Sequence, residues 1–376
     1  MPWKAISVMS LRHEFVTMVK DSKMSFSEMC RRFNISRKTG YKWLHRYLEE
    51  GALGLADRSR KPHQIIFKVE KTLEDRIVTL RERYPTWGAR KLRRKLQDSR
   101  VTAVPACSTI TTVLHRHGLI RPEDSIKCQD WQRFEHPVPN SLWQMDFKGS
   151  VPTLAGPCQP LTILDDYSRF NLCLEVLPNQ QTNRVQRALE TTFGRYGVPD
   201  RLVMDNGGPW GFDSEHPYTP LTVWLIRVGV SISHSRPYHP QTLGKDERFY
   251  RTLKRDLLNR FQWRDHHHLQ QAFDPWRHEY NFERPHDALG LTVPASRYQP
   301  SLRCFPDKLP PIEYPTGVEV RKVQFGGDVF FKGRIFHVAR AFHGYPVGIR
   351  PSLIDGVFDV LFCHATISHI DMKNKS

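Results

Sequence analysis

Three acidic side chains, far apart along the chain, have the types and settings that suit phosphoryl-transfer chemistry. Asp146 lies inside the apolar run 142–147, Asp205 ends the apolar run 202–204 at a glycine turn, and Glu247 opens a basic amphipathic segment. A carboxylate inside a strand is costly unless a cation or hydrogen bonds compensate it. Three converging carboxylates would hold two Mg²⁺ ions, because Mg²⁺ prefers hard oxygen ligands and keeps positions open for phosphate.

The helical period favours Glu247 over its neighbour Asp246 as the third acid. At about 100° per residue, Arg251 and Lys254 share a stripe with Glu247, so that face combines an acid with two cations spaced for a phosphate backbone. Asp246 lies on the stripe of apolar residues such as Phe249, which predicts a capping or first-turn acid. We therefore predict that Glu247 is the metal ligand and that Arg251 and Lys254 contact DNA.

The apolar pattern predicts an α/β sheet as the scaffold for these acids. Three short apolar runs form an antiparallel meander: residues 142–147, 161–164 and 172–176. Farther along, strands alternate with helices, which are expected at 182–196, 219–228 and 268–281. A meander followed by alternating strands and helices indicates a sheet with helices on its faces.

A helix-turn-helix unit is predicted at the start of the chain. Residues 10–50 give three helices, and Ser36 is placed to cap the third, in which Tyr41, Leu44 and Leu48 are expected to face inward. Its outward cations are predicted to contact the major groove of DNA: Arg37, Lys38, Lys42 and Arg46. The alternative is an ordinary small helical bundle with a solvated basic face.

Residues 66–120 repeat this pattern and predict a second helix-turn-helix unit. One helix ends near Tyr84, a very basic one follows Trp87, and Ser108 is expected to cap the last. Further DNA contacts are predicted on the basic helix: Arg90, Arg93 and Arg94. Two such units in series would read a longer DNA site than one.

The charge balance agrees with a polyanionic partner. The formal net charge is +17, with 56 Lys and Arg against 39 Asp and Glu. Such an excess favours nucleic acid over a membrane, since no amphipathic anchor accompanies it, although a merely basic protein is the alternative. The seven cysteines show no C-x-x-C spacing, and no apolar run approaches the ~18 residues of a membrane span. A cytoplasmic protein with reduced thiols is expected.

Beyond residue 294 the chain becomes proline-rich and then turns into short strands. These are expected at 318–323, 329–331, 335–338, 347–349 and 357–362, with tight turns at Lys332-Gly333 and Asp355-Gly356. The spacing predicts a small SH3-like β-barrel whose role the sequence leaves undecided. Four domains are predicted: 1–60, 61–135, 136–298 and 299–376.

Five motifs follow one another in an order that resembles a known family. They are Trp143-Gln144-Met145-Asp146, Asp165-Asp166-Tyr167-Ser168-Arg169, Asp205-Asn206-Gly207, the run 239–249 from His239-Pro240-Gln241 to Glu247-Arg248-Phe249, and Tyr280-Asn281 with Arg284-Pro285-His286. Residues 141–295 look like the integrase catalytic core of bacterial insertion-sequence transposases, relatives of retroviral integrases. The resemblance implies an RNase H-like fold, Mg²⁺ or Mn²⁺, and DNA cleavage and strand transfer by Asp146, Asp205 and Glu247.

The gap between the second and third acids, 247 − 205 = 42 positions, is longer than in many members of that family. An insertion near 210–220 is the predicted cause, and its acids Asp213 and Glu215 are discounted as ligands. Asp165 and Asp166 are expected to shape a turn at a strand end. The family's retroviral zinc module has no counterpart among the His and Cys spacings.

The combined prediction is a bacterial, nucleoid-associated DNA transposase. It would bind the double-stranded ends of its element, expose a 3′-hydroxyl and join it to target DNA, using two Mg²⁺ or Mn²⁺ ions per active site. Because two ends must be held together, at least a homodimer is expected. One alternative is a catalytically inactive, transposase-derived DNA-binding regulator. Another is an RNase H-type nuclease, which would explain the acids but not the two helix-turn-helix units.

Overall fold

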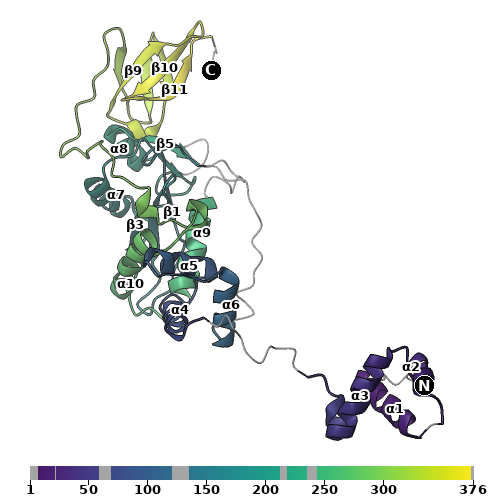
Figure 1. The fold of residues 1–376 in the computed structure, drawn as a ribbon. Helices are drawn as coiled ribbons and strands as arrows, with labels where there is room; N and C mark the ends of the chain where they lie inside the picture. The colour runs from purple at the N-terminus through teal and green to yellow at the C-terminus, as the bar shows by residue number, and fades with distance from the viewer. Residues whose placement is uncertain are drawn as a thin grey trace. The chain divides into compact units, whose positions relative to one another are not determined.

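The chain forms two compact units, Met1–Lys68 and Val69–Ser376. The computed structural model describes residues 7–21, 23–58, 69–120, 135–211, 218–234 and 244–373. Figure 1 shows the helices of the first unit in purple and the strands at the C-terminus of the second in yellow. Among the described helices, none combines the length and the apolar character needed to cross a membrane.

The first unit is a three-helix module with a closing turn. It consists of α1 (Val8–Asp21), α2 (Phe26–Arg32), α3 (Arg37–Glu50) and the 3-10 turn η1 (Gly51–Leu55). The Ser36 hydroxyl accepts a hydrogen bond from the Thr39 N–H and caps α3 as predicted. Phe15, Val16 and Leu55 are among the side chains buried between these elements.

The inward face of α3 differs from the predicted one. Tyr41 and Leu48 are 49% and 60% exposed, whereas Trp43 is buried and Gly40 lies against Cys30 and Phe15. A Cβ at residue 40 would come within 2.7 Å of the Cys30 sulfur, so glycine lets α2 approach α3 closely. The helical period was right, but the stripe that packs is the one with the small residue and the tryptophan.

The second unit begins with another three-helix module. Its helices are α4 (Lys71–Arg83), α5 (Ala89–Asp98) and α6 (Cys107–Arg116), which close over Ile77, Leu92, Ile110 and other apolar residues. The predicted Ser108 cap is wrong, because α6 starts at Cys107 and the cap position is occupied by Ala106, two residues before Ser108. Ser108 is thus an exposed residue of the first turn.

A five-stranded sheet forms the centre of the second unit. The strands are β1 (Trp143–Phe147), β2 (Gln159–Asp165), β3 (Asn171–Leu177), β4 (Arg201–Met204) and β5 (Ser231–His234), in the order β3-β2-β1-β4-β5. β1, β2 and β3 pair antiparallel, whereas β4 and β5 run parallel to β1. This mixed sheet confirms the predicted RNase H-like α/β core.

Helices cover both faces of the sheet. Residues of α7 (Thr182–Tyr196) and α8 (Pro220–Val228) pack on one face with Trp143, Met145 and Met204. The other face is covered by α9 (Gly244–Leu253), its π-helical continuation η4 (Lys254–Leu258) and α10 (His266–His278), which is followed by the π-helical turn η5 (Glu279–Glu283). Successive side chains of a strand point to opposite faces, so each strand contributes to both cores.

The C-terminal residues form a small all-β domain, as predicted. β6 (Glu319–Lys322), β9 (Pro346–Pro351), β10 (Val357–Phe362) and β11 (Ala365–Asp371) make a four-stranded sheet, and β7 (Asp328–Phe331) pairs with β8 (Arg334–His337). The last strand, β11, was missed by the sequence analysis. Val223 and Ile226 of α8 are buried in the same cluster as residues of this domain, which therefore packs on the sheet domain.

Candidate active site

Asp146 and Asp205 lie next to each other because the strands that carry them are neighbours. β1 and β4 pair in parallel, with Gln144 opposite Val203, and each acid stands two residues farther along its strand. Trp143, Met145 and Met204 point into the core under α7 and α8. By the two-residue period, Asp146 and Asp205 point to the other face, which α9 covers.

The two carboxylates interact electrostatically. Burial, followed by the charge of Asp205, raises the pKa of Asp146 to about 6. A hydrogen bond from Tyr250 and the nearby Lys148 ammonium oppose this rise. Two negative charges held close together in a partly buried place repel each other, and a bound cation would reduce this repulsion.

Asp205 is oriented by its own turn. Its carboxylate accepts hydrogen bonds from the Gly207 N–H at 3.0 Å and from the Trp210 indole N–H. The Trp210 ring is buried and stacks on Phe147 of β1, with centroids 5.1 Å apart. Residue 210 was predicted to lie in an insertion, whereas Trp210 packs into the sheet and hydrogen-bonds Asp205.

The turn after β2 fixes the start of α9. Asp165 accepts from the Ser168 N–H and hydroxyl and from the Asn140 N–H, which agrees with the predicted turn-shaping role. Asp166 is almost fully buried and pairs with Lys245, in the first turn of α9. This ion pair joins residues 79 positions apart and sets how α9 is rotated about its axis.

The structure brings Asp246, and not Glu247, to the side of Asp146. Asp246 is fully buried, and burial, together with the charges of Asp146 and Asp166, raises its pKa well above the ordinary value. Within the described part of the chain, neither of its carboxylate oxygens has a hydrogen-bond partner. Glu247 is exposed on the same face of the helix as Arg251.

The helical stripe explains this difference from the prediction. Phe249 and Leu253 pack against the sheet, and Glu247 lies about 160° from Phe249 and about 120° from Leu253 around the helix axis, on the side that faces solvent. The same spacing that groups Glu247 with Arg251 and Lys254 therefore turns it outward. Among the described residues, no three His, Cys, Asp or Glu side chains are placed to hold one metal ion.

Two further residues of the site were missed by the sequence analysis. The Tyr250 hydroxyl lies 2.7 Å from the Thr162 hydroxyl and hydrogen-bonds Asp146. Burial, followed by the nearby Lys254, lowers the pKa of Lys148. Lys148 follows Asp146 by two positions, which on a strand predicts the same face, so its proximity was available from the sequence.

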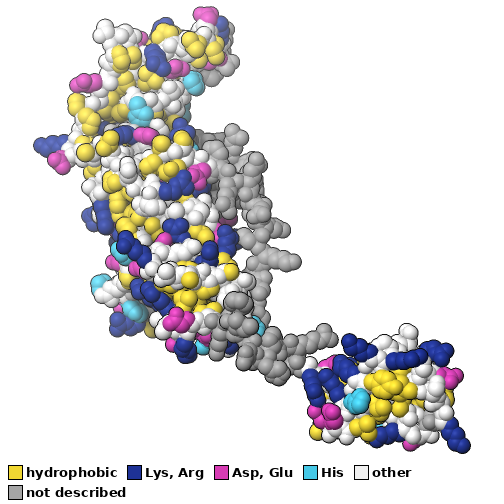
Figure 2. All heavy atoms as spheres, viewed as in Figure 1, with side chains coloured by type: hydrophobic (Ala, Val, Ile, Leu, Met, Phe, Trp, Pro, Cys, Tyr) yellow, Lys and Arg dark blue, Asp and Glu magenta, His cyan; other side chains and the backbone are white. Residues whose placement is uncertain are grey.

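The cations predicted to contact DNA fall into three groups. On α3, Arg37, Lys38 and Lys42 are exposed, and Lys42 and Arg46 lie over the Trp43 ring at 4.6 and 5.2 Å. Figure 2 shows Lys and Arg side chains around the edge of the visible face of this module and hydrophobic side chains near its centre. On the α9–η4 helix, Arg251 and Lys254 are exposed.

The third group, on α5, has partners within the chain. Arg90 pairs with Asp287 at 3.2 Å, Arg93 Nε donates to the Pro105 carbonyl, and Arg94 pairs with Asp98 of its own helix. His239, Asp213 and Glu215 lie outside the described residues. The three consecutive histidines at 266–268 start α10, where Asp265 caps the helix by accepting from the His268 N–H.

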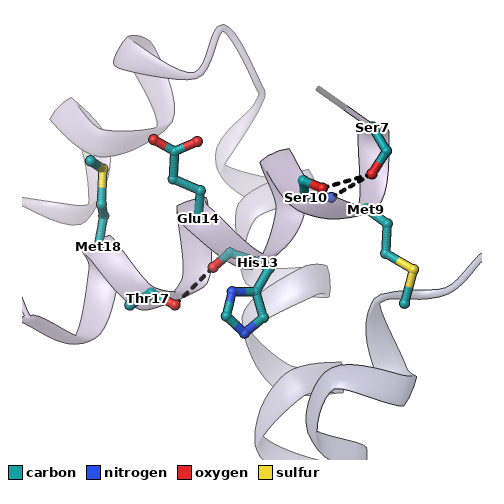
Figure 3. Close-up of a pocket in the computed structure, with 7 residues that line it drawn as sticks. All are labelled: Ser7, Met9, Ser10, His13, Glu14, Thr17 and Met18. Carbon is teal, nitrogen blue, oxygen red and sulfur yellow. Dashed lines mark hydrogen bonds between the residues drawn. The ribbon is translucent and has the colours of Figure 1, made fainter. Parts of the chain in front are cut away.

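A surface pocket lies elsewhere, on α1 of the first unit. Figure 3 shows that its polar groups are used within the helix: the Thr17 hydroxyl donates to the His13 carbonyl at 3.0 Å, and Ser10 bonds to Ser7. Its lining consists of Ser7, Met9, Ser10, His13, Glu14, Thr17 and Met18. The pocket contains one acid and one histidine, whereas the candidate site on the sheet contains a pair of acids.

Five family models match successive parts of the chain. A "Helix-turn-helix domain" matches residues 12–63, and a "Homeodomain-like domain" matches residues 39–114. Two models described as "Integrase core domain" match residues 136–240 and 228–294. The description "IS481 family transposase, C-terminal domain" belongs to the model that matches residues 318–376.

Curated relatives come from insertion elements. The chain is 25% identical over 158 residues to the insertion element IS407 uncharacterized 31.7 kDa protein of Burkholderia multivorans, covering 42% of this chain and 55% of that protein. It is equally identical over 158 residues to the IS476 uncharacterized 39.2 kDa protein of Xanthomonas euvesicatoria, covering 44% of it. The chain thus spans about half the length of these curated relatives.

Two solved viral structures match parts of the chain. A simian T-cell lymphotropic virus intasome in complex with PP2A regulatory subunit B56 gamma matches 77% of this chain and 96% of its own, with a TM-score of 0.36 and 14% identity. The HTLV-2 integrase catalytic core domain in complex with magnesium, in its trimeric form, matches 43% of this chain and 97% of its own, with a TM-score of 0.33 and 14% identity.

The order of the family matches defines a class of protein that combines helix-turn-helix modules with an integrase core. The C-terminal match narrows this class. In its order of domains the chain resembles insertion-sequence transposases that combine an integrase-type core with a C-terminal domain of the IS481 type.

Proposed function

We propose that the protein cuts and joins DNA strands at the ends of an insertion element. The helix-turn-helix modules would bind the double-stranded ends, and the sheet domain would carry out hydrolysis and strand transfer at Asp146, Asp205 and Glu247. Two ends must be held at once, so the active form is proposed to be at least a dimer. In a bacterial cell this chemistry would take place on the nucleoid.

The observation that carries this proposal is the pair Asp146 and Asp205. Their hard carboxylate oxygens come from neighbouring parallel strands, and the charge of one raises the pKa of the other. This donor set fits Mg²⁺ or Mn²⁺, which prefer hard oxygen ligands. Two such ions, when bound, would neutralise the charge that develops at the attacking and leaving oxygens of a phosphoryl transfer.

The remaining residues of the site have roles that follow from their contacts. Trp210 and the Gly207 N–H hold the Asp205 carboxylate in one orientation, and Tyr250 does the same for Asp146. Exposed Arg251 and Lys254 would hold the phosphate backbone, since they lie about one and two turns beyond Glu247 on the same stripe. None of these side chains needs to accept or donate the reacting proton.

The third acid requires a choice between neighbours. The resemblance to the family selects Glu247, yet Asp246 is the acid buried beside Asp146 in this arrangement. Rotating α9 by about 100° would exchange them, because consecutive residues differ by that angle. We propose that Glu247 takes the third position when DNA and metal are bound.

Two observations favour a second candidate, a DNA-binding regulator without catalytic activity. Glu247 is exposed, and the described residues include no group of three side chains placed to hold a metal ion. The basic helix-turn-helix modules would suit this function equally well.

The test compares Glu247→Gln with its matched neighbour Asp246→Asn. Labelled duplexes carrying the element's end, identified as an inverted repeat in the flanking DNA, are incubated with the full chain and Mg²⁺ or Mn²⁺. Glu247→Gln is expected to reduce nicking by at least ~10³-fold, as the loss of a group acting in the transition state does. Binding of the same duplex is expected to stay within about twofold in both variants, and Asp246→Asn is expected to keep nicking.

Loss of nicking in Asp246→Asn alone would instead make Asp246 the third acid. A wild-type chain that binds the duplex but never nicks it, with either metal, would leave the regulator as the function.

A further inference from the structure

Helix α5 is joined to the integrase core by ion pairs. Glu283, at the end of η5, accepts contacts at 2.6, 3.3 and 3.5 Å from three side chains of the helical module: Tyr84, Lys95 and Arg83. Arg90 pairs with Asp287 at 3.2 Å. The helical module and the core accordingly fall in one compact unit, whereas the first helix-turn-helix module forms a unit of its own.

Glu283 and Asp287 belong to the segment that supports α9. Between them in sequence, Arg284 pairs at 2.8 Å with Asp256, at the end of the helix that α9 begins, and both side chains are buried. The Tyr280 ring packs against Phe249 of α9, with centroids 5.0 Å apart. Packed side chains therefore join α5 to the helix that carries the third acid.

These contacts use the basic helix that was predicted to contact DNA, including Arg90 itself. The Lys95 side chain is 25% exposed, and Lys91 is partly buried near Arg284 and Asp287. A cation that is already paired with a carboxylate gains little binding free energy from a DNA phosphate. It therefore releases few counterions from the DNA. Arg94 instead pairs with Asp98 of its own helix, and Arg93 donates to the Pro105 carbonyl within the helical module.

Helix α6 presents a different outer surface. Its apolar side chains, Ile110, Val113 and Leu114, are buried. Ser108, Thr112 and His115 are exposed and spaced four and three residues apart, which puts them on one stripe. The Thr112 hydroxyl donates to the Ser108 carbonyl at 3.0 Å and would therefore act as an acceptor toward a base, whereas the Ser108 hydroxyl and the His115 imidazole can donate or accept.

We propose that Glu283 and Asp287 dock the α4–α6 module on the integrase core through α5, and that α6 reads DNA bases. The proposal rests on the proposed function only in taking DNA as the ligand. Because the reading helix is held against the segment that supports α9, the base pairs that it reads lie at a fixed offset from the strand that is cut.

The first test measures the salt dependence of binding to a pool of random-sequence duplexes. Each lost phosphate contact lowers the slope of log K against log salt by about 1. Lys38→Ala, on the exposed face of α3, is expected to lower the slope by this amount. Lys95→Ala and Arg90→Ala are expected to leave it unchanged, and a drop equal to that of Lys38→Ala in both would overturn the proposal.

The second test follows amide hydrogen exchange in the full chain without DNA or metal. Glu283→Gln is expected to speed exchange in α5 and η5 roughly tenfold, since a charged hydrogen-bond acceptor is lost. Charge reversal in Glu283→Lys should do more, and the double variant Glu283→Lys/Lys95→Glu should recover most of the protection. Arg94→Ala is the matched control on the same helix. Unchanged exchange in both Glu283 variants would rule out the docking.

The third test selects preferred sequences from the random pool. Thr112→Ala/His115→Ala is expected to change which bases are enriched, and Arg90→Ala/Lys95→Ala is expected to keep them. If Arg90→Ala/Lys95→Ala changed the enriched bases and Thr112→Ala/His115→Ala did not, then α5 and not α6 would read the bases. None of the three tests needs DNA cleavage. The docking and base reading can therefore be tested even if the protein never nicks DNA.

Discussion

At the scale of single residues, the site is built on charge repulsion that the fold tolerates. Asp146 is held beside Asp205 by strand register, and fully buried Asp246 lies near both Asp146 and Asp166. Such an arrangement costs stability in the absence of a cation. Strain of this kind at an acidic cluster is typical of functional sites rather than of ordinary cores.

A pH dependence of stability follows for Asp146. Its pKa is about 6 in the folded protein against an ordinary 3.8, so between these values the folded chain keeps a proton that the unfolded chain has lost. The free energy of unfolding must therefore fall as pH rises through this window. Asp146→Asn is expected to remove roughly 1–3 kcal/mol of this fall.

Unfolding in EDTA at several pH values between about 4 and 7 measures this effect. The exposed Asp307→Asn is the control and should reproduce the wild-type curve. If the free energy of unfolding of Asp146→Asn fell with pH as steeply as that of the wild type, Asp146 would not be buried beside the charge of Asp205.

At the scale of elements, the orientation of α9 depends on one buried ion pair. Lys245 in its first turn meets Asp166, which also accepts hydrogen bonds from the His136 N–H and the Gln144 amide, each at 2.8 Å. The apolar stripe of α9, which includes Phe249 and Leu253, then faces the sheet. Together these contacts decide which of the two neighbouring acids faces the sheet.

Breaking this pair tests how strongly it holds the helix. Lys245→Met leaves the Asp166 carboxylate buried with two donors, and we expect a loss of about 1–3 kcal/mol in the free energy of unfolding. The double variant Lys245→Met/Asp166→Asn should lose less than the sum of the single variants. Exposed Lys308→Met is the control. Additive losses would show that the two residues do not interact.

At the scale of the whole molecule, the C-terminal β-domain completes a core that α8 begins. Val223 and Ile226 point away from the sheet and are each 1% exposed, in one cluster with Val347, Phe362 and other residues of that domain. Tyr218 adds a ring contact with Phe342 at 4.9 Å. The β-domain is therefore a structural partner of the integrase core as well as a surface of its own.

Removing residues 318–376 should make Ile226 a surface residue. Ile226→Thr is expected to cost about 2 kcal/mol in the full chain, where it leaves a hydroxyl and a gap in a packed core. In the shortened chain the same change should cost close to nothing and should reduce binding of a hydrophobic dye. Equal costs in the two chains would mean that α8 does not depend on the β-domain.

Much of this architecture was predictable from the sequence, because it depends on local patterns. The apolar runs gave the strands that carry Asp146 and Asp205, and α7 begins and ends at the predicted residues 182 and 196. Serine before a helical pattern predicted the cap at Ser36. Where the local pattern was ambiguous, as for Ser108 or the buried stripe of α3, the prediction failed.

The sequence by itself determined which residues share a strand face or a helical stripe, since these follow from fixed periods of about two and 3.6 residues. It grouped Glu247 with Arg251 and Lys254, and it grouped Asp246 with Phe249. Only the tertiary structure decided which stripe meets the sheet and which basic helix meets the core. Those choices depend on partners far away in the chain, such as Asp166 for Lys245 and Glu283 for Lys95, and no local period encodes them.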